Sequence, residues 1–307
     1  MATLYYPVML RFLVVLMLPC FVHAEALVDE RIPAYVIRLP ASVQSVFVAE
    51  TSTATFYRFA RGPGNTIDKR GATYMSIGEN GDGKQRDGDR RTPLGIYFVT
   101  EQLDTSKLHE KYGLTAFTLD YPNAWDRRMQ RTGDGIWIHG VDRRAGKRPP
   151  RDTDGCIALP NDVLAMLESQ FAANATPVVI AREINWVDPG ELSATRRELD
   201  AAVSLWANSL RDGDLYTYLS LYDDNFRHWG MDKAEWTALQ TETLASRSIR
   251  KVTVGELLLL ADPAEDGMYL SRFRLGVTEG TNTVEVTKRL YWRAGRSTLT
   301  IIAEDSG

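Results

Sequence analysis

The sequence has 307 residues, of which 44% are hydrophobic and 25% are charged, and these fractions are typical of a folded globular protein. Its 36 basic and 40 acidic side chains give a formal net charge of −4 at pH 7, so the chain lacks the overall positive field of a nucleic-acid-binding protein. We expect no nucleic-acid partner, and the length favours two domains.

The N-terminus carries the pattern of a secretory signal. Arg11 precedes an apolar run from Phe12 to Val22, which ends at the small-residue sequence Val22-His23-Ala24. We therefore expect residues 1–24 to be a signal peptide, and Cys20 to leave with it. A transmembrane helix needs about 20 apolar residues, and neither this run nor any later segment approaches that length. The mature chain should make no stable membrane insertion.

The segment after the signal predicts mostly strands. Residues rich in β-branched and aromatic side chains predict strands over 45–49, 55–59 and 72–77. A segment of turns from 78 to 93 contains four glycines, and it leads to a further strand over 95–100. The glycine spacing matches neither a Walker nor a dinucleotide-binding pattern, so we interpret this segment as a flexible loop that is a candidate for function.

Two reactive residue types follow. The apolar segment from Gly135 to His139 predicts a strand that ends in a histidine. Cys156 lies further on, in Asp154-Gly155-Cys156-Ile157, and is the one cysteine left after signal cleavage. Because a lone thiol in a secreted protein has no intramolecular disulfide partner, reactivity explains it better than packing. The alternative is a buried cysteine and a core histidine, which is common for either residue alone.

A helix is predicted directly after the cysteine. Apolar residues over 161–171 have helical spacing, Asn161 or Asp162 can cap the helix, and a strand returns over 177–181. A thiolate near a helix N-terminus is stabilised, so we expect the pKa of Cys156 to be lowered.

A break at Val187-Asp188-Pro189-Gly190 separates a second unit. An amphipathic helix runs along Leu199 to Leu210, with Thr195 and Glu198 at capping-box spacing, and a second helix starts at Asp214. Alternating residues then predict antiparallel strands over 251–260, 268–277, 283–292 and 297–303. Helices followed by strands indicate an independent α+β domain. We expect domains at 25–187 and 193–307, joined by a linker at 188–192.

Five short motifs in one order carry a family resemblance. They are Gly88-Asp89, Thr92-Pro93-Leu94-Gly95-Ile96-Tyr97, Leu119-Asp120-Tyr121-Pro122-Asn123, Ile138-His139-Gly140 and Gly155-Cys156-Ile157. Together they resemble the L,D-transpeptidase (YkuD-like) catalytic domain of bacterial cell-wall enzymes. The second unit is similar to the cone-shaped nuclear transport factor 2-like (NTF2-like) fold. The pair resembles the cell-shape-determining L,D-carboxypeptidases of helical bacteria, which implies a mostly β, sandwich-like catalytic domain and an α+β cone domain in the periplasm.

The reaction follows from these residues and the resemblance. A Cys156 thiolate would attack a peptide carbonyl, with His139 as a base that ionises near neutral pH. The resemblance implies that Gly155 and Cys156 surround the oxyanion and that a backbone carbonyl near Gly140 orients the histidine. It also implies a tetrapeptide stem of peptidoglycan as acyl donor, with loss of its terminal D-alanine. An amine acceptor would give a crosslink, and water would make the protein an L,D-carboxypeptidase.

Substrate-binding residues are expected on both sides of His139. Tyr121 and Asn123 resemble the pocket wall of the family, and Asp154 occupies a variable position beside the nucleophile. Ala158 stands where many members have a substrate-binding arginine, which puts crosslink formation in doubt. Arg143 and Arg151, in a basic cluster with Arg144, Lys147 and Arg148, can bind stem-peptide carboxylates instead. The alternative for this cluster is a solvated loop, and both remain open.

No cofactor and no metal are expected, because His109 and His228 lie in unrelated segments and structural zinc normally needs four ligands. The second domain carries aromatic residues at helical spacing, which are more often core than cavity lining. They are Trp206, Tyr218, Tyr222, Phe226 and Trp229, with Asp223 and His228 as a candidate polar pair. We expect this domain to orient peptidoglycan or to bind a periplasmic protein. A non-catalytic peptidoglycan-binding module is the remaining alternative.

Overall fold

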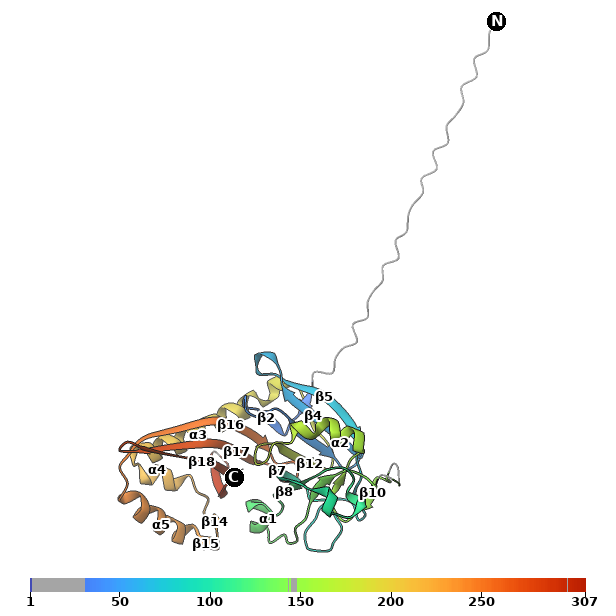
Figure 1. The fold of residues 1–307 in the computed structure, drawn as a ribbon. Coiled ribbons are helices and arrows are strands. Elements are labelled where there is room, and N and C mark those ends of the chain that lie inside the picture. The colour runs from blue at the N-terminus through green and yellow to red at the C-terminus, as the bar shows by residue number, and fades with distance from the viewer. Residues whose placement is uncertain (2–30, 143, 145–147, 297) are drawn as a thin grey trace.

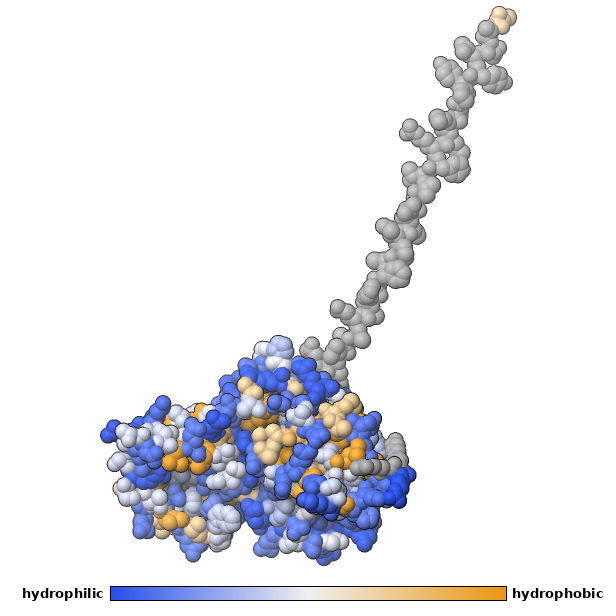
Figure 2. Space-filling model, viewed as in Figure 1, coloured by the Kyte–Doolittle hydropathy of each residue, from blue (hydrophilic) through white to orange (hydrophobic). Residues whose placement is uncertain are grey.

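The structure is a computed structural model that describes Met1 and residues 31–142, 144, 148–296 and 298–307 (Figure 1). Apart from Met1, the predicted signal peptide lies outside the described residues. Two units lie side by side in Figure 1, the first around the strands β3–β12 (residues 46–181) and the second around the long strands β16–β18 (residues 249–294). On the face seen in Figure 2, hydrophilic residues predominate and apolar residues form small separate groups. None of the described helices combines the length and apolarity needed to cross a membrane.

The first unit is built on a sheet of eight strands, which confirms the predicted mostly β domain. Two neighbouring inner strands, at 46–50 and 177–181, are entirely buried, as expected for strands covered on both faces. In sheet order the strands are β11 (Ile157–Ala158), β9 (Trp137–His139), β8 (Ala116–Leu119), β7 (Gly95–Leu103), β12 (Pro177–Ala181), β3 (Val46–Glu50), β4 (Thr55–Arg61) and β5 (Ile67–Tyr74). The predicted strands at 45–49, 55–59, 95–100 and 177–181 correspond to β3, β4, β7 and β12.

The strand predicted over 72–77 is interrupted. β5 ends at Tyr74, and β6 (Ile77–Gly78) pairs with β10 (Arg151–Thr153) in a separate two-stranded sheet. Between them, the backbone of Ser76 exchanges two hydrogen bonds of 2.9 Å with that of Ala158. The chain therefore leaves the large sheet to pair with the segment that carries the cysteine.

The predicted helix after the cysteine is shorter than expected and is capped differently. α2 spans Asn161–Leu167 and continues as a 3₁₀ turn over Glu168–Gln170. The N-cap residue is Pro160, and no side chain caps the helix. The expected cap by Asn161 or Asp162 is wrong, because the first turn starts at Asn161 itself and its side chain is bonded elsewhere. α1 (Ala124–Arg128) is the other helix of this unit.

The second unit is α+β, as predicted. Its helices cover a curled antiparallel sheet and enclose a core that contains Trp206, Tyr222, Phe226, Phe273 and Trp292 (Figure 1). The elements are α3 (Ser193–Asp212), α4 (Leu215–Ser220), β14 (Arg227–His228), β15 (Met231–Asp232), α5 (Lys233–Ala245), β16 (Ile249–Ala261), β17 (Met268–Glu279), β18 (Asn282–Ala294) and β19 (Leu299–Ser306).

The start of α3 differs from the prediction. The capping box lies at Asp188 and Glu191, in a 3₁₀ turn over Pro189–Leu192, and not at Thr195 and Glu198. Helical structure continues from this turn into Ser193, so Thr195 is already inside α3. Asp214 caps α4 as expected, by accepting a hydrogen bond from the Thr217 N–H at 3.0 Å.

The two units share structure across the predicted boundary. β1 (Ile32–Pro33) pairs with β13 (Trp186–Val187), and β2 (Val36–Arg38) extends the second sheet by pairing with Leu259 and Leu260 of β16. One hydrophobic cluster contains residues of both units, including Val46, Val179, Leu260 and Tyr291. A division at 188–192 therefore does not separate the two sheets completely.

Candidate active site

The sheet register brings the histidine and the cysteine to one cavity. β9 and β11 run parallel, with Ile138 opposite Ile157 and His139 opposite Ala158. Because alternate residues of a strand point to the same face, Ile138 and Ile157 face the core, while His139 and Cys156 project from the opposite face. Both side chains line a cavity of about 580 Å³.

The thiol of Cys156 is held in a buried position. Sγ lies 3.4 Å from the carbonyl oxygen of Gly135 and receives a backbone hydrogen bond from Trp137, and the residue is 8% exposed. Burial raises the pKa of Cys156 to about 11, and the negative charge of Asp154 acts in the same direction. The expected lowering of this pKa is wrong, because α2 begins only at Asn161 and burial outweighs the other influences. The thiol is neutral at pH 7.

His139 is arranged to accept a proton at Nε2. Its Nδ1 lies 2.6 Å from the carbonyl oxygen of Gly140, and a carbonyl oxygen only accepts, so Nδ1 carries the proton. Burial lowers the pKa of His139 to about 4, with smaller effects in the same direction from Arg148 and Lys111. The imidazole is therefore neutral at pH 7, and the expectation that it ionises near neutral pH is wrong. The ring of Tyr112 packs edge-on against it at 5.1 Å.

Two threonines fix the backbone around the nucleophile. Thr153 Oγ1 donates to the Cys156 carbonyl at 2.7 Å and accepts from the Gly155 N–H at 3.1 Å. Thr92 Oγ1 donates to the Gly155 carbonyl at 2.9 Å. Gly155 has φ +123, and a Cβ there would lie 2.8 Å from the Arg91 carbonyl oxygen, so only glycine fits. Gly155 and Cys156 were both expected to bind the oxyanion. The Gly155 N–H already donates to Thr153, so the Cys156 N–H is the one that remains for this role.

Charged groups of both signs surround the pair. Lys111 Nζ lies 3.2 Å from Asp154 and 5.1 Å from the centre of the Tyr112 ring. Arg148 Nε lies 3.0 Å from Asp152. The lining also includes the acidic side chains Glu79, Asp87 and Asp134, and the basic side chains Lys84 and Arg90. The cavity can therefore accommodate a ligand that carries both carboxylate and ammonium groups.

The structure separates the predicted substrate-binding residues. Asp154 lines the cavity, whereas Tyr121, Asn123 and Arg151 do not. The Tyr121 hydroxyl donates to the Thr132 carbonyl at 3.0 Å, and Asn123 caps α1 and donates to the Ile96 carbonyl at 2.9 Å. Tyr121 therefore holds the segment that leads to Asp134 and Gly135, and Asn123 joins the start of α1 to β7.

The basic cluster is also divided. Arg151 lies near Asp82, outside the cavity lining. Burial acts to raise the pKa of Asp82, but hydrogen bonds from Arg182 and Thr51 and the positive charges of Arg182 and Arg151 lower it overall. Arg144 forms an ion pair with Glu110, and Arg143 lies outside the described residues. Arg148 is the described member of the cluster that reaches the cavity.

Sequence reasoning missed Thr153, Tyr112 and Lys111 as site residues. The threonine two positions before Gly155 is a recognisable turn signal, because its hydroxyl can bond to nearby backbone. Tyr112 and Lys111 carry no comparable signal, since they reach the cavity through a 3₁₀ turn over Glu110–Tyr112.

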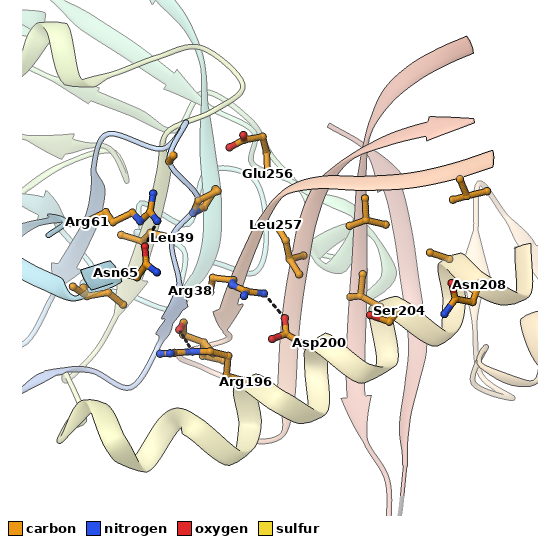
Figure 3. A pocket seen from close by; sticks show the side chains of 18 residues that line it. Arg38, Leu39, Arg61, Asn65, Arg196, Asp200, Ser204, Asn208, Glu256 and Leu257 are labelled. Carbon is orange, nitrogen blue, oxygen red and sulfur yellow. Dashed lines mark hydrogen bonds and ion pairs between the residues drawn. The ribbon is translucent and has the colours of Figure 1, made fainter. Parts of the chain in front are cut away.

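A larger cavity of about 790 Å³ lies between the two units (Figure 3). It is lined by β2, the β4–β5 hairpin, α3 and β16, and its lining contains neither cysteine nor histidine. Its charged groups are bonded within the protein, Arg38 to Asp200 and Arg196 to the Ile37 carbonyl. This cavity therefore lacks the groups for acyl transfer.

In the second unit, Trp206, Tyr218, Tyr222 and Phe226 belong to the buried core, and Trp229 is 79% exposed. The candidate polar pair is not formed: Asp223 accepts from Thr300 at 2.9 Å, and His228 Nδ1 lies 3.1 Å from the Glu304 carbonyl oxygen.

Among the described residues, no group of three or more His, Cys, Asp or Glu side chains is placed to hold a metal ion.

Comparisons with known proteins agree with the two units. Residues 44–180 match the model of the L,D-transpeptidase (YkuD) catalytic domain, and residues 198–305 match that of the Cds6 C-terminal NTF2-like domain. The chain is similar to the structure of Bd1075 from Bdellovibrio bacteriovorus, with 25% identity and a TM-score of 0.75 over 90% of this chain and 98% of that one. It is also similar to Pgp2, the helical cell shape determining protein of Campylobacter jejuni, with 22% identity and a TM-score of 0.71 over 88% of this chain and 95% of that one. No curated protein sequence matches the chain. The chain thus carries an L,D-transpeptidase catalytic domain followed by an NTF2-like domain.

Proposed function

We propose that the protein is a cysteine acyltransferase that acts on peptidoglycan stem peptides, with Cys156 as nucleophile and His139 as general base. The observation that carries this proposal is the placement of a neutral thiol and a neutral imidazole on one face of the β9–β11 pair, in one cavity of an L,D-transpeptidase catalytic domain. Stem peptides lie outside the cytoplasmic membrane, so the proposal also places the protein in the periplasm, in agreement with the predicted signal peptide.

The first half of the reaction forms a thioester. The Cys156 thiol gives its proton to Nε2 of His139 while Sγ bonds to the donor carbonyl carbon, so the charged pair forms only as the reaction proceeds. The carbonyl oxygen becomes an oxyanion, which the Cys156 N–H can stabilise. When the tetrahedral intermediate collapses, the bond to the terminal D-alanine nitrogen breaks, and this amine takes the proton from His139.

The second half releases the acyl group. An acceptor gives a proton to Nε2 of His139 and bonds to the thioester carbon, and the Cys156 sulfur then leaves and recovers the proton. Lys111 and Arg148, which lie close enough to influence the pKa of both reacting residues, can bind the carboxylates of the donor.

Water is the second candidate acceptor, and it would make the protein an L,D-carboxypeptidase. Ala158 is 2% exposed and lies opposite His139, so the side chain that binds substrate in many family members is absent at this position. The likeness to Pgp2 over nearly the whole chain suggests a role in cell shape, for which trimming of stem peptides would suffice.

Product analysis tests both acceptors. Purified protein is incubated with tetrapeptide muropeptides, alone and with an added amine acceptor, and the products are weighed by mass spectrometry. Tripeptide would indicate hydrolysis, and crosslinked dimers would indicate transpeptidation. Lys107→Ala, at a highly exposed side chain, serves as the control and should act like the unmodified protein. Intact tetrapeptide in every reaction would contradict the proposal.

A further inference from the structure

The side-chain amide of Asn161 joins three segments of the catalytic domain around His139. Its Oδ1 accepts hydrogen bonds from the backbone N–H of Val141 at 3.2 Å and of Leu114 at 3.4 Å. Its Nδ2 donates to the carbonyl oxygen of Val141 at 2.8 Å. Asn161 therefore ties the start of α2 to the segment that leaves β9 and to the segment that enters β8.

The bond to the Val141 N–H fixes the direction of the Gly140 carbonyl group. The two groups belong to one planar trans peptide unit, in which they point in opposite directions. With the N–H held by Asn161, the carbonyl oxygen points away from Asn161, and it lies 2.6 Å from Nδ1 of His139. This contact keeps the imidazole proton on Nδ1 and leaves Nε2 as the acceptor.

Two glycines make room for the amide. A Cβ at Gly140 would lie 2.1 Å from Oδ1 of Asn161, and a Cβ at Gly113 would lie 2.4 Å from the same atom. Both distances are far below van der Waals contact, so a side chain at either position would displace the amide. Gly113 also has φ +73, a conformation that favours glycine. The three residues therefore form one unit, although they are far apart in the sequence.

We propose that Asn161 is a positioning residue for the reaction: through the Gly140–Val141 peptide it selects the His139 tautomer that presents an unprotonated Nε2 to Cys156. The catalytic consequence rests on the proposed function, because it requires His139 to act as the base. If Asn161 served only to stabilise the loop, its removal would change the unfolding temperature and leave the tautomer of a folded variant unchanged.

Activity measurements form the first part of the test. Asn161→Ala removes the acceptor and the donor, whereas Asn161→Asp keeps an acceptor oxygen for the Val141 N–H. We expect Asn161→Ala to lower kcat on tetrapeptide muropeptide by about 10- to 100-fold, the scale for losing a group that orients a functional histidine, with KM little changed. Asn161→Asp should recover part of kcat, because it keeps the acceptor for the Val141 N–H but loses the donor to the Val141 carbonyl. Asp162→Ala, at the exposed neighbouring position, is the matched control and should leave kcat unchanged.

Imidazole nitrogen NMR forms the second part and needs no substrate. His139→Gln identifies the signals of His139. The unmodified protein and Asn161→Asp should show a protonated Nδ1 and a bare Nε2, and Asn161→Ala should show a mixture of tautomers. If Asn161→Ala does not fold, Gly140→Ala displaces the same amide and should give the same mixture.

The outcomes separate this inference from the proposed function. An unchanged His139 tautomer in a folded variant without the amide contact would overturn the inference, whatever the activity. If the tautomer changes in Asn161→Ala but the unmodified protein itself turns over no stem peptide, the inference is supported and the proposed acyl transfer is contradicted.

Discussion

Replacing Arg289 should destabilise the protein by removing the cation that joins its two domains. Arg289, on β18, is 8% exposed and forms ion pairs with Asp305 of the second domain and Asp120 of the first. Its Nη2 lies 2.8 Å from Asp305, and its guanidinium lies 5.3 Å from the centre of the Phe98 ring. Arg289→Met keeps much of the side-chain volume but leaves two buried carboxylates without their cation.

The expected loss is about 3 to 5 kcal/mol in the free energy of unfolding at pH 8, the scale for removing one partner of a buried ion pair. Burial already raises the pKa of Asp120, and Arg289 acts in the opposite direction, so its removal should raise this pKa further. The variant therefore binds a proton more readily in the folded state, and its loss of stability should be smaller at pH 5 than at pH 8.

Denaturant unfolding, followed by tryptophan fluorescence at both pH values, measures this effect. The control is Arg274→Met, an exposed arginine on the adjacent strand β17, which should change stability by less than about 0.5 kcal/mol. Adding Asp120→Asn to Arg289→Met removes one of the two carboxylates that have lost their cation, and it should recover part of the loss. Equal stability of Arg289→Met and Arg274→Met, or a loss that grows as the pH falls, would contradict a stabilising role for the Arg289 ion pairs.

Four further predictions concern ionisation and catalysis. Burial raises the pKa of Asp262 to about 7, so this residue contributes stability at low pH that is lost as the pH rises through 7. At pH 8, Asp262→Asn should therefore be more stable than the unmodified protein, by on the order of 1 to 3 kcal/mol in the free energy of unfolding. Thermal unfolding should show this gain shrinking towards pH 4. Because the pKa of His139 is about 4, the acid limb of kcat/KM should fall near pH 4, and a limb near pH 6.5 would contradict the burial of this imidazole. His139→Gln should lower kcat about 10²-fold or more in the same assay, and undiminished rates would assign the base elsewhere. Alkylation of Cys156 by iodoacetamide should be slow at pH 7 and rise towards pH 11, whereas a fast reaction at neutral pH would indicate a thiolate.

The sequence predicted those parts of the fold that depend on local patterns. Alternating and β-branched residues identified β3, β4, β7 and β12 to within a few residues, and Asp214 identified the start of α4. The cysteine and histidine were recognisable as a pair because their neighbouring motifs occur in one order. Local composition carries this information, so no tertiary contact was needed to find it.

Other features depend on contacts between distant segments. Burial raises the pKa of Cys156, although the backbone hydrogen bond from Trp137 acts in the opposite direction. This burial cannot be read from the residues that follow the cysteine. β2 joins the second sheet through residues more than two hundred positions away. Tyr121 and Asn123 lie in a motif that the sequence placed at the pocket wall, yet their polar groups are bonded to backbone inside the domain. From its position before an apolar run, Asn161 was predicted to cap a helix. Its side chain instead bonds to Val141 and Leu114, which are distant in the sequence.

The proposed reaction requires Cys156 to form a covalent thioester with a stem peptide. The most direct measurement is intact-mass analysis of the protein, quenched in acid during turnover of tetrapeptide muropeptide, followed by peptide mapping. We expect an acyl adduct on the peptide that contains Cys156, and neither adduct nor turnover in Cys156→Ala. Turnover by Cys156→Ala above a few per cent of the unmodified rate, or an adduct on another residue, would contradict it.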